Sequence, residues 1–219
     1  MPWEWEKDAD VLEITNQIKN IKESFGLRLT CHPGQYSPLN TPNEKVLHNA
    51  INDFHYHNTL MNLVGGTDII THVGGMYGDK DTAKLSFIKN YNNLSEDIKK
   101  KLRLENDDKT FTVEDVLDIS LKCGVPICLD IHHHNCNSSG NIRNLIHDVM
   151  KSWDGYGTPK FHISTGKSFK TDRAHADYIS IEDFLDFVDI LGDYDTDIMF
   201  ESKTKDLSVL NIQKSMLGG

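Results

Sequence analysis

Side chains of the kinds that bind metal ions stand at the ends of six separate apolar runs in this sequence. They are His32, His72, Glu105, Asp130, His133, His162 and Glu201. Imidazole and carboxylate groups together suit Zn²⁺, Mn²⁺ or Mg²⁺. A cluster of such ions hydrolyses phosphodiesters, because it generates hydroxide and holds both the attacking and the leaving oxygen. If the six run ends meet in space, the sequence predicts a metal site of this kind.

Two histidine positions leave alternatives open. His175 lies between two aspartates in the loop TDRAHADY, where it is either an eighth ligand or an ordinary surface residue. Eight ligands are enough for two or three ions. The histidines at 132–134 form either a solvated loop or part of the site, and the buried apolar run that ends at Asp130 favours the site. His133 joins Asp130 only if the chain leaves strand geometry there, because alternate residues of a strand share one face.

Five other residues stand where they would act beside these ligands. Lys160 shares a strand face with the histidine two residues later, and it is either a lysine at the solvent end of the strand or, deprotonated or modified to a carbamate, a ligand. Gln35 and Tyr36 follow a tight Pro-Gly exit. They are either ordinary loop residues or a pair that enters a stack of nucleic-acid bases. Lys203 and Lys205 follow the last strand, where they would meet phosphate.

The elements that must position these residues alternate between helix and strand. Apolar spacing predicts helices over residues 8–25, 43–63, 81–101, 112–122, 141–153, 180–191 and 206–216. Short apolar runs predict strands over residues 27–31, 67–73, 102–105, 125–131, 160–164 and 196–201. The strands are apolar on both faces, which is typical of parallel strands buried between layers. In an α/β barrel the carboxyl ends of such strands meet at one mouth, which would bring the ligands together.

This order of elements predicts an α/β fold of the TIM-barrel (β/α)8 type that lacks its first strand, helix and strand. A complete barrel has eight strands and typically about 250 residues. The 219-residue chain shows only six strands and begins with a helix. No linker or low-complexity tract interrupts the pattern. We therefore expect one domain over residues 1–219, truncated at its N-terminal end.

The amino-acid composition restricts the classes of partner that the protein is expected to bind and the cellular compartment in which it is expected to work. The formal net charge of −10 argues against a generic nucleic-acid binder, which usually has a basic face, although bound cations would offset acidic ligands. The mean hydropathy is −0.47, and no run approaches the roughly 20 apolar residues of a membrane helix. The N-terminus lacks the pattern of a secretory signal. Four cysteines without CxxC spacing predict reduced thiols. We expect a protein of the cytoplasm, or of the nucleus in a eukaryote, that is not secreted.

Seven segments, taken in order, resemble the UV damage endonuclease family. They are TCHPGQYSPLN, ITHVGG, LRLENDD, ICLDIHHHNC, KFHIS, AHADYI and MFESKTKD. The resemblance extends from about residue 28 to residue 206, and it implies a TIM barrel related to endonuclease IV. It also implies a metal-dependent DNA repair enzyme that cuts the phosphodiester 5′ to a UV photoproduct or an abasic site and leaves a 3′-hydroxyl. The family begins with a strand, a helix and a strand that precede Met1, so activity depends on whether this length suffices.

The resemblance also assigns roles to single residues. The implied metal ligands are His32, His72, Glu105, Asp130, His133, His162, His175 and Glu201. Lys160, Glu105 and Glu201 would take part in catalysis, and Gln35 and Tyr36 match the pair that probes the damaged strand. The implied cofactors are two or three divalent ions, of which Mn²⁺ is the first choice and Zn²⁺ or Mg²⁺ the alternatives. The implied partner is damaged double-stranded DNA bound by a monomer.

Two other functions compete with this interpretation. A metal-dependent sugar isomerase or epimerase on the related xylose-isomerase-like barrel also uses strand-end Glu, Asp and His, but usually fewer imidazoles. The set of five histidines and the Gln35-Tyr36 loop favour the nuclease. The third alternative is a fragment that binds metal or damaged DNA without turnover.

Overall fold

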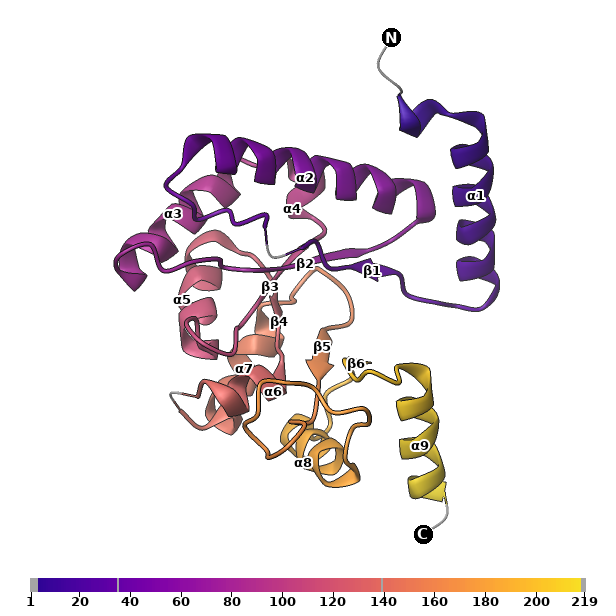
Figure 1. Ribbon diagram of the computed structural model, residues 1–219, viewed down its shortest axis with the longest axis vertical. Helices are drawn as coiled ribbons and strands as arrows, with labels where there is room; N and C mark the ends of the chain where they lie inside the picture. The colour runs from indigo at the N-terminus through magenta and orange to yellow at the C-terminus, as the bar shows by residue number, and fades with distance from the viewer. Residues whose placement is uncertain (1–3, 35, 139, 218–219) are drawn as a thin grey trace. The chain divides into compact units, whose positions relative to one another are not determined.

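The computed structural model of the chain describes residues 4–34, 36–138 and 140–217 (Figure 1). The chain forms two compact units, Met1–Arg103 and Leu104–Gly219. Unit 1 contains a short 3₁₀ helix (Trp5–Lys7), α1 (Ala9–Ser24), β1 (Thr30–Cys31), α2 (Glu44–Val64), β2 (Asp68–His72), α3 (Lys80–Asn92) and α4 (Glu96–Lys99). Strand β3 (Leu102–Glu105) crosses the boundary between the units. Unit 2 continues with α5 (Val113–Cys123), β4 (Ile127–Cys128), α6 (Ile131–Cys136), α7 (Ile142–Lys151), β5 (Lys160–Ile163), α8 (Ile181–Leu191), β6 (Asp197–Phe200) and α9 (Asp206–Leu217).

Parallel strands form the centre of unit 1, with α2 alongside them. β1 pairs with β2 in parallel, and the N–H of Ile69 donates to the carbonyl of Lys101 at 2.7 Å, just before β3. Helix α2 begins at Asn43, whose side chain caps the first turn, and ends at Gly65, which has a φ of 70°. Glycine adopts this left-handed conformation without steric cost. α2 packs against both strands through its apolar face, so the carboxyl ends of β1 and β2 are held in fixed positions (Figure 1).

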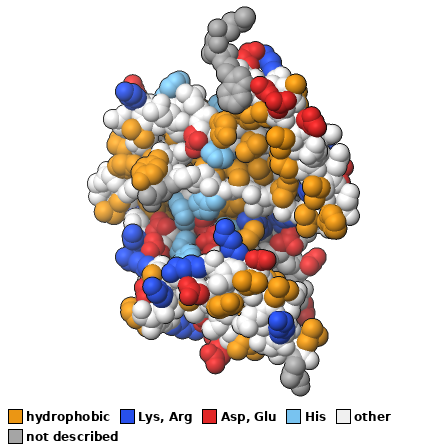
Figure 2. Space-filling view, turned by 45° about the vertical axis from the view of Figure 1, so that its right-hand side comes forward, with side chains coloured by type: hydrophobic (Ala, Val, Ile, Leu, Met, Phe, Trp, Pro, Cys, Tyr) orange, Lys and Arg blue, Asp and Glu red, His pale blue; other side chains and the backbone are white. Residues whose placement is uncertain are grey.

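The apolar face of α1 is exposed to solvent in the described part of the chain. Ile14, Ile21 and Phe25 are 54–75% exposed, whereas Thr15 is the one buried residue that α1 contributes. Figure 2 shows hydrophobic side chains gathered on the surface of unit 1. The carboxylate of Asp8 caps the amino end of α1, and the helix packs on α2. The Asp8 cap and the contact with α2 therefore hold α1 in place, although most of its apolar side chains stay exposed.

A hydrogen-bonded carboxylate links α2 to α4 and gives unit 1 a predicted sensitivity to acid. Asp97 accepts hydrogen bonds from Asn58, from Asn62 at 2.9 Å and from Lys101 at 3.0 Å. The hydrogen bond from Asn58, followed by those from Asn62 and Lys101, lowers the pKa of Asp97 below its ordinary value of 3.8. Because the pKa is lowered in the folded state, the stabilisation is complete above pH 3.8 and is lost as the pH falls below it.

Asp97→Asn is therefore expected to flatten the loss of stability between about pH 5 and pH 2. The side chain is 53% exposed, so the effect at neutral pH should stay below about 1 kcal/mol. Urea unfolding midpoints measured across this pH range test the prediction. A variant whose midpoints fall with acid as steeply as those of the wild type would contradict it.

In unit 2, successive parallel pairings bring the carboxyl ends of four strands together. Glu105 at the end of β3 pairs with Cys128 of β4, and a bridge joins Asp130 to His162 of β5. β5 then pairs along its whole length with β6, residue 160 opposite residue 197 and residue 163 opposite residue 200. Helix α5 begins with a reciprocal capping box at Thr112 and ends at Gly124, which has a φ of 77°. The predicted α/β class with parallel strands is confirmed, and the described residues contain six strands.

Three local predictions were wrong. The strand predicted over residues 27–31 is reduced to Thr30–Cys31, because the N–H of Leu27 still bonds to the last turn of α1. The helix predicted over residues 81–101 is divided into α3 and α4, because Leu94 is buried between them and Ser95 starts the second helix. The strand predicted over residues 125–131 is reduced to Ile127–Cys128, since Asp130 caps the short helix α6. None of the described helices combines the length and the apolar character that a membrane span requires.

Candidate metal centre

Three buried side chains form the centre of the candidate site in unit 2. Glu105 ends β3, Asp130 follows β4 and His162 lies in β5, and their ligand atoms lie within 4.8 Å of one another. The exposed fractions are 1%, 0% and 2%. Two carboxylates that share a dry site repel each other and are costly to ionise without a cation. The arrangement has the chemistry of a divalent cation site.

Asp130 gives a direct indication that this site fits a cation. Its Oδ1 atom accepts a hydrogen bond from the N–H of His133 at 2.8 Å, which caps helix α6. Its Oδ2 atom is buried and accepts no hydrogen bond from the residues that the structure describes. Buried carboxylate oxygens are rarely left in this state. A bound metal ion would satisfy this oxygen.

His133 is oriented as a ligand by its neighbours. The chain leaves strand geometry at Asp130, so α6 places the Nδ1 atom of His133 3.7 Å from Asp130 and 3.9 Å from Glu105. Nδ1 lies 3.0 Å from the carbonyl of Asn106, to which it donates. Nε2 then carries the lone pair that a metal needs. Burial lowers the pKa of His133, but Asp130 and Glu105 outweigh it, and the net pKa is raised.

The other two histidines of the run, His132 and His134, are almost fully buried in α6. Burial lowers the pKa of both imidazoles, so they are neutral near pH 7. The run at 132–134 is therefore not a solvated loop. Its three members face different neighbours, because a helix separates consecutive side chains by about 100°.

His162 connects both catalytic carboxylate candidates to Lys160. Its Nδ1 atom lies 2.8 Å from Glu105 and 3.1 Å from Glu201. Its Nε2 atom lies 2.9 Å from Nζ of Lys160, which is 4% exposed. Burial would lower the pKa of His162, but Cys128 and Glu105 raise it well above the usual value. Lys160 is thus an interior neighbour of the candidate ligands and not a lysine at the solvent end of a strand.

His175 lies at the rim of the same group. Its Nδ1 atom is 3.2 Å from the hydroxyl of Ser164, and its ring centroid is 6.4 Å from that of His133. Glu201, at the end of β6, is partly exposed. Unit 2 thereby collects six of the eight predicted ligands. They are Glu105, Asp130, His133, His162, His175 and Glu201.

The remaining two predicted ligands lie together in unit 1. His32 follows β1 and His72 ends β2, and their ring centroids are 5.2 Å apart. The Nδ1 atom of His32 lies 3.0 Å from the carbonyl of Pro33. When Nδ1 donates to this carbonyl, Nε2 is the nitrogen left for a metal.

The predicted DNA-binding residues lie on exposed loops where they are described. Tyr36 is 83% exposed, and Gln35 lies outside the described residues. Lys203 is 54% exposed and lies 3.8 Å from Asp177. Lys205 is exposed and has a φ of 50°, a left-handed conformation that is uncommon outside glycine. Contact with DNA remains a prediction for all four.

Comparison with known proteins identifies the relatives of this chain. The model of the UV-endonuclease UvdE family matches residues 4–218. The chain belongs to the UvdE family. It is 38% identical to the UV DNA damage endonuclease of Clostridium perfringens over 97% of its own length and 53% of that protein. It is also 38% identical to the UV DNA damage endonuclease of Bacillus mycoides, over 91% of this chain and 65% of that protein. The chain thus spans about half to two thirds of the length of these relatives.

Solved structures confirm the TIM-barrel type of the UvdE chain. The crystal structure of SacUVDE is 30% identical, has a TM-score of 0.89 and is matched over 100% of this chain and 74% of that chain. Endonuclease IV from Thermus thermophilus, at 14% identity and a TM-score of 0.67, shares the fold over 97% of this chain and 83% of its own. A D-tagatose 3-epimerase-like protein also shares the fold, with 17% identity and a TM-score of 0.69. The match covers 97% of this chain and 86% of that protein. Because the epimerase fold is so similar, fold alone does not separate nuclease from epimerase.

One residue of the candidate site was not predicted from the sequence. Asn106 is fully buried, and its side chain makes two 2.9 Å hydrogen bonds, one to the N–H and one to the carbonyl of Asp130. Its own carbonyl orients His133. Asn106 therefore positions two candidate ligands. Its place directly after the strand-end Glu105 was the one signal that the sequence offered.

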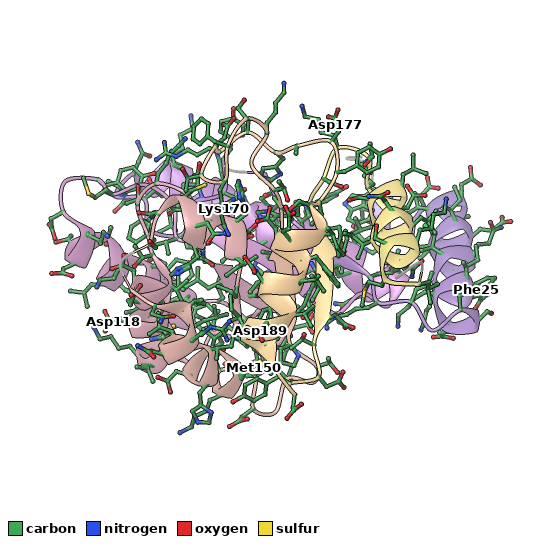
Figure 3. The ribbon with its side chains drawn as sticks, turned by 90° about the horizontal axis from the view of Figure 1, so that it is seen from below. Phe25, Asp118, Met150, Lys170, Asp177 and Asp189 are labelled. Atoms are coloured by element: carbon green, nitrogen blue, oxygen red, sulfur yellow. The ribbon has the colours of Figure 1, made fainter. Side chains whose placement is uncertain are left out.

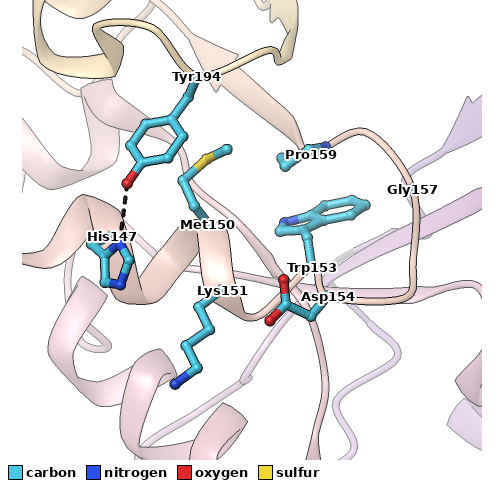
Figure 4. A pocket seen from close by; sticks show the side chains of 8 residues that line it. All are labelled: His147, Met150, Lys151, Trp153, Asp154, Gly157, Pro159 and Tyr194. Atoms are coloured by element: carbon cyan, nitrogen blue, oxygen red, sulfur yellow. Dashed lines mark hydrogen bonds between the residues drawn. The ribbon is translucent and has the colours of Figure 1, made fainter.

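A cavity of about 470 Å³ lies away from the candidate ligands of the UvdE chain. It is lined by residues of α7 and by Pro159, which precedes β5, and Figure 4 shows the 3.0 Å hydrogen bond between His147 and Tyr194 at its edge. In Figure 3, Met150 of this cavity lies on the opposite side of unit 2 from Lys170 and Asp177, which belong to the loop after β5. The cavity is therefore separate from the candidate metal centre.

Proposed function

We propose that this chain is a metal-dependent DNA repair endonuclease that hydrolyses the phosphodiester 5′ to UV photoproducts or abasic sites and leaves a 3′-hydroxyl. Membership of the UvdE family and the similarity to UV DNA damage endonucleases support the reaction class. The single observation that carries the proposal is the buried group of Glu105, Asp130 and His162, with an Asp130 oxygen that accepts no hydrogen bond from the described residues. Such a group fits divalent ions.

The eight predicted ligands would hold two or three divalent ions, with Mn²⁺ as first choice and Zn²⁺ or Mg²⁺ as alternatives. When bound, the ions would supply an activated water and stabilise the leaving 3′ oxygen. The protein's own part is orientation, since Asn106 and Glu105 fix the ring positions of His133 and His162. A dry environment strengthens each of these contacts.

Three side chains beside the ligands would handle charge and protons during the reaction. Glu105 and Glu201 each lie close enough to Nδ1 of His162 to accept its proton. Nζ of Lys160 lies 2.9 Å from Nε2 of the same ring, and its ammonium would offset the negative charge of a phosphate group. We propose Lys160, Glu105 and Glu201 as the catalytic residues.

The proposed substrate is damaged double-stranded DNA bound by a monomer. Lys203 and Lys205 would contact phosphates as point charges, and Gln35 and Tyr36 would probe the stack at the lesion. The enzyme would work wherever the genome lies, which is the cytoplasm of a bacterium or the nucleus of a eukaryote. A chain with a net charge of −10 would need such local contacts, because its overall charge repels DNA.

A nicking assay tests the proposal. UV-irradiated and undamaged supercoiled plasmid are incubated with the protein and Mn²⁺, with EDTA in a parallel sample. We expect nicking that depends on damage and disappears with EDTA. A folded protein that binds Mn²⁺ but leaves both plasmids intact would contradict the proposal and support the alternative of a fragment without turnover. Isomerisation or epimerisation of a sugar by the same preparation would support the other alternative.

Tyr36→Ala is expected to reduce discrimination between damaged and intact DNA by about 10-fold, because a base–aromatic stack of about 1–3 kcal/mol is lost. Metal content should not change, since Tyr36 is exposed. The measurement is the ratio of nicking rates on the two plasmids. Tyr56→Ala, which removes a tyrosine from the outer part of α2, serves as the matched control. Equal ratios for Tyr36→Ala and the wild type would remove Tyr36 from lesion recognition.

A further inference from the structure

The loop after β5 in unit 2 is a folded structure that presents His175. Its two sides run antiparallel, with the N–H of Lys167 donating to the carbonyl of Ala174 at 2.7 Å. The N–H of Ala176 donates to the carbonyl of Thr165 at 2.8 Å. These two bonds bracket His175 and fix its backbone. The position of the imidazole therefore depends on the position of the whole loop.

Asp172 closes the tip of this loop. Its carboxylate accepts hydrogen bonds from the N–H groups of Ser168 and Ala174, both at 3.0 Å. The turn is so tight that a Cβ atom at Gly166 would lie 2.1 Å from the carbonyl oxygen of Phe169. The loop is therefore held together by its own hydrogen bonds. A contact that fixes the position of Asp172 also fixes the position of His175.

His132 makes such a contact from helix α6. Its ring is 1% exposed, and its Nε2 atom lies 3.0 Å from the carbonyl oxygen of Asp172. A carbonyl only accepts, so Nε2 carries the hydrogen and donates. The same ring lies against His175, with ring centroids 5.6 Å apart and the two ring planes at 86° to each other. One turn later, Cys136 lies with its Sγ atom 3.5 Å from the carbonyl of Thr171.

We infer that His132 is a positioning residue that fixes the loop of residues 164–177 on α6 and so holds His175 where it can bind an ion. With Nε2 donating to Asp172, that nitrogen has no lone pair for a metal, which separates the role of His132 from that of His133. The inference rests on the proposed metal site for the role of His175, but the contact itself exists without metal.

Limited trypsin digestion of the metal-free protein tests the loop directly. The loop contains three exposed cleavage positions, Lys167, Lys170 and Arg173. His132→Phe keeps an aromatic ring against His175 but cannot donate to the carbonyl of Asp172. We expect cleavage in the loop about fivefold faster, the factor that one hydrogen bond of typical strength contributes. His132→Gln, which restores an N–H donor of similar reach, should bring the rate back toward that of the wild type.

A matched control comes from the same helix. His134 is also buried, and its Nδ1 atom has no hydrogen-bond partner among the described residues. His134→Phe makes the same chemical change without touching the loop. Cleavage of the loop should stay at the wild-type rate. Equal acceleration by His134→Phe and His132→Phe would show a general loosening of α6 and would overturn the inference.

Mn²⁺ titration by calorimetry gives the second readout. We expect His132→Phe to weaken the affinity of the ion that depends on His175 by about 10-fold, as for other residues that orient metal ligands. The ion in question is the one whose binding is reduced by His175→Ala. In the double variant, His132→Phe should add nothing to the loss caused by His175→Ala, because both act on one ligand. Fully additive losses would contradict the inference.

Gly166→Ala keeps the inference testable if His132→Phe does not fold. The added methyl group collides with the backbone at Phe169 and should displace the loop while α6 stays intact. We expect the same faster cleavage and the same weakened Mn²⁺ binding. A wild-type protein that binds no Mn²⁺ would refute the metal site but not the loop contact. Unchanged cleavage and unchanged affinity in both variants would refute the contact alone.

Discussion

Glu105→Gln is expected to reduce damage-dependent nicking by more than about 100-fold. Glutamine has the same shape as glutamate and can still accept the 2.8 Å hydrogen bond from His162, so the substitution removes a charge and little else. Residues that merely orient metal ligands cost about 10–100-fold when replaced. Loss of a buried ligand carboxylate should cost more. The initial nicking rate on irradiated plasmid at saturating Mn²⁺ measures the effect.

The same variant separates the loss of metal from the loss of fold. Saturating Mn²⁺ at about 100 times its Kd should raise the free energy of unfolding of the wild type by about 2.7 kcal/mol, and this increase should shrink in Glu105→Gln. Without metal, the stability of the variant should stay close to that of the wild type, because the repulsion from Asp130 and the attraction to His162 are lost together. Glu182→Gln, on the exposed first turn of α8, is the control and should behave as the wild type. Undiminished nicking by Glu105→Gln would refute its role as a ligand.

Asp68→Ala is expected to destabilise unit 1 by about 3–5 kcal/mol. Asp68 opens β2 and is completely buried between two arginines. Nη2 of Arg28 lies 2.8 Å from Oδ2, and Nε of Arg103 lies 2.7 Å from Oδ1. Arg103 is itself 3% exposed, so loss of the carboxylate leaves a buried guanidinium without its counter-ion. Urea unfolding at neutral pH measures the loss.

Two comparisons sharpen this test. Asp81→Ala removes an exposed carboxylate that pairs with Lys84 at 3.2 Å, and it should cost less than about 0.5 kcal/mol. The double variant Asp68→Leu/Arg103→Met replaces both buried charges by apolar groups and should be more stable than Asp68→Ala. If Asp68→Ala costs no more than Asp81→Ala, the buried ion pairs do not stabilise the fold in the way described.

Elements whose ends are defined by local chemistry could be predicted from the sequence. Helix α2 lies within two residues of its predicted bounds, because Asn43 caps it and Gly65 ends it. Helix α5 lies between Thr112 and Gly124 for the same reason. These signals depend on backbone conformation at one or two residues, so they can be read without the tertiary structure. The carboxyl ends of the strands other than β4 were also predicted to within one residue, because a polar side chain interrupts each apolar run.

Features that depend on distant partners were missed. Helix α6 has the sequence IHHHNC, which carries little helix propensity, and it forms because Asp130 caps it and Asn106 binds the backbone at its start. The contact between His132 and Asp172 joins residues 40 positions apart. No local pattern predicts such pairs. The single domain over residues 1–219 remains a prediction, as do the site roles.

The two carboxylate oxygens of Asp130 restrict the choice of amino acid at this position to different degrees. Oδ1 caps α6, a task that asparagine or serine performs equally well. Oδ2 contributes no comparable hydrogen bond to the fold, since no described residue donates one to it. Selection for a stable fold alone would therefore accept several amino acids here, and only the proposed metal site would require aspartate. Among diverged copies of this chain, the identity of residue 130 would then distinguish those that keep the proposed metal site from those that keep only the fold.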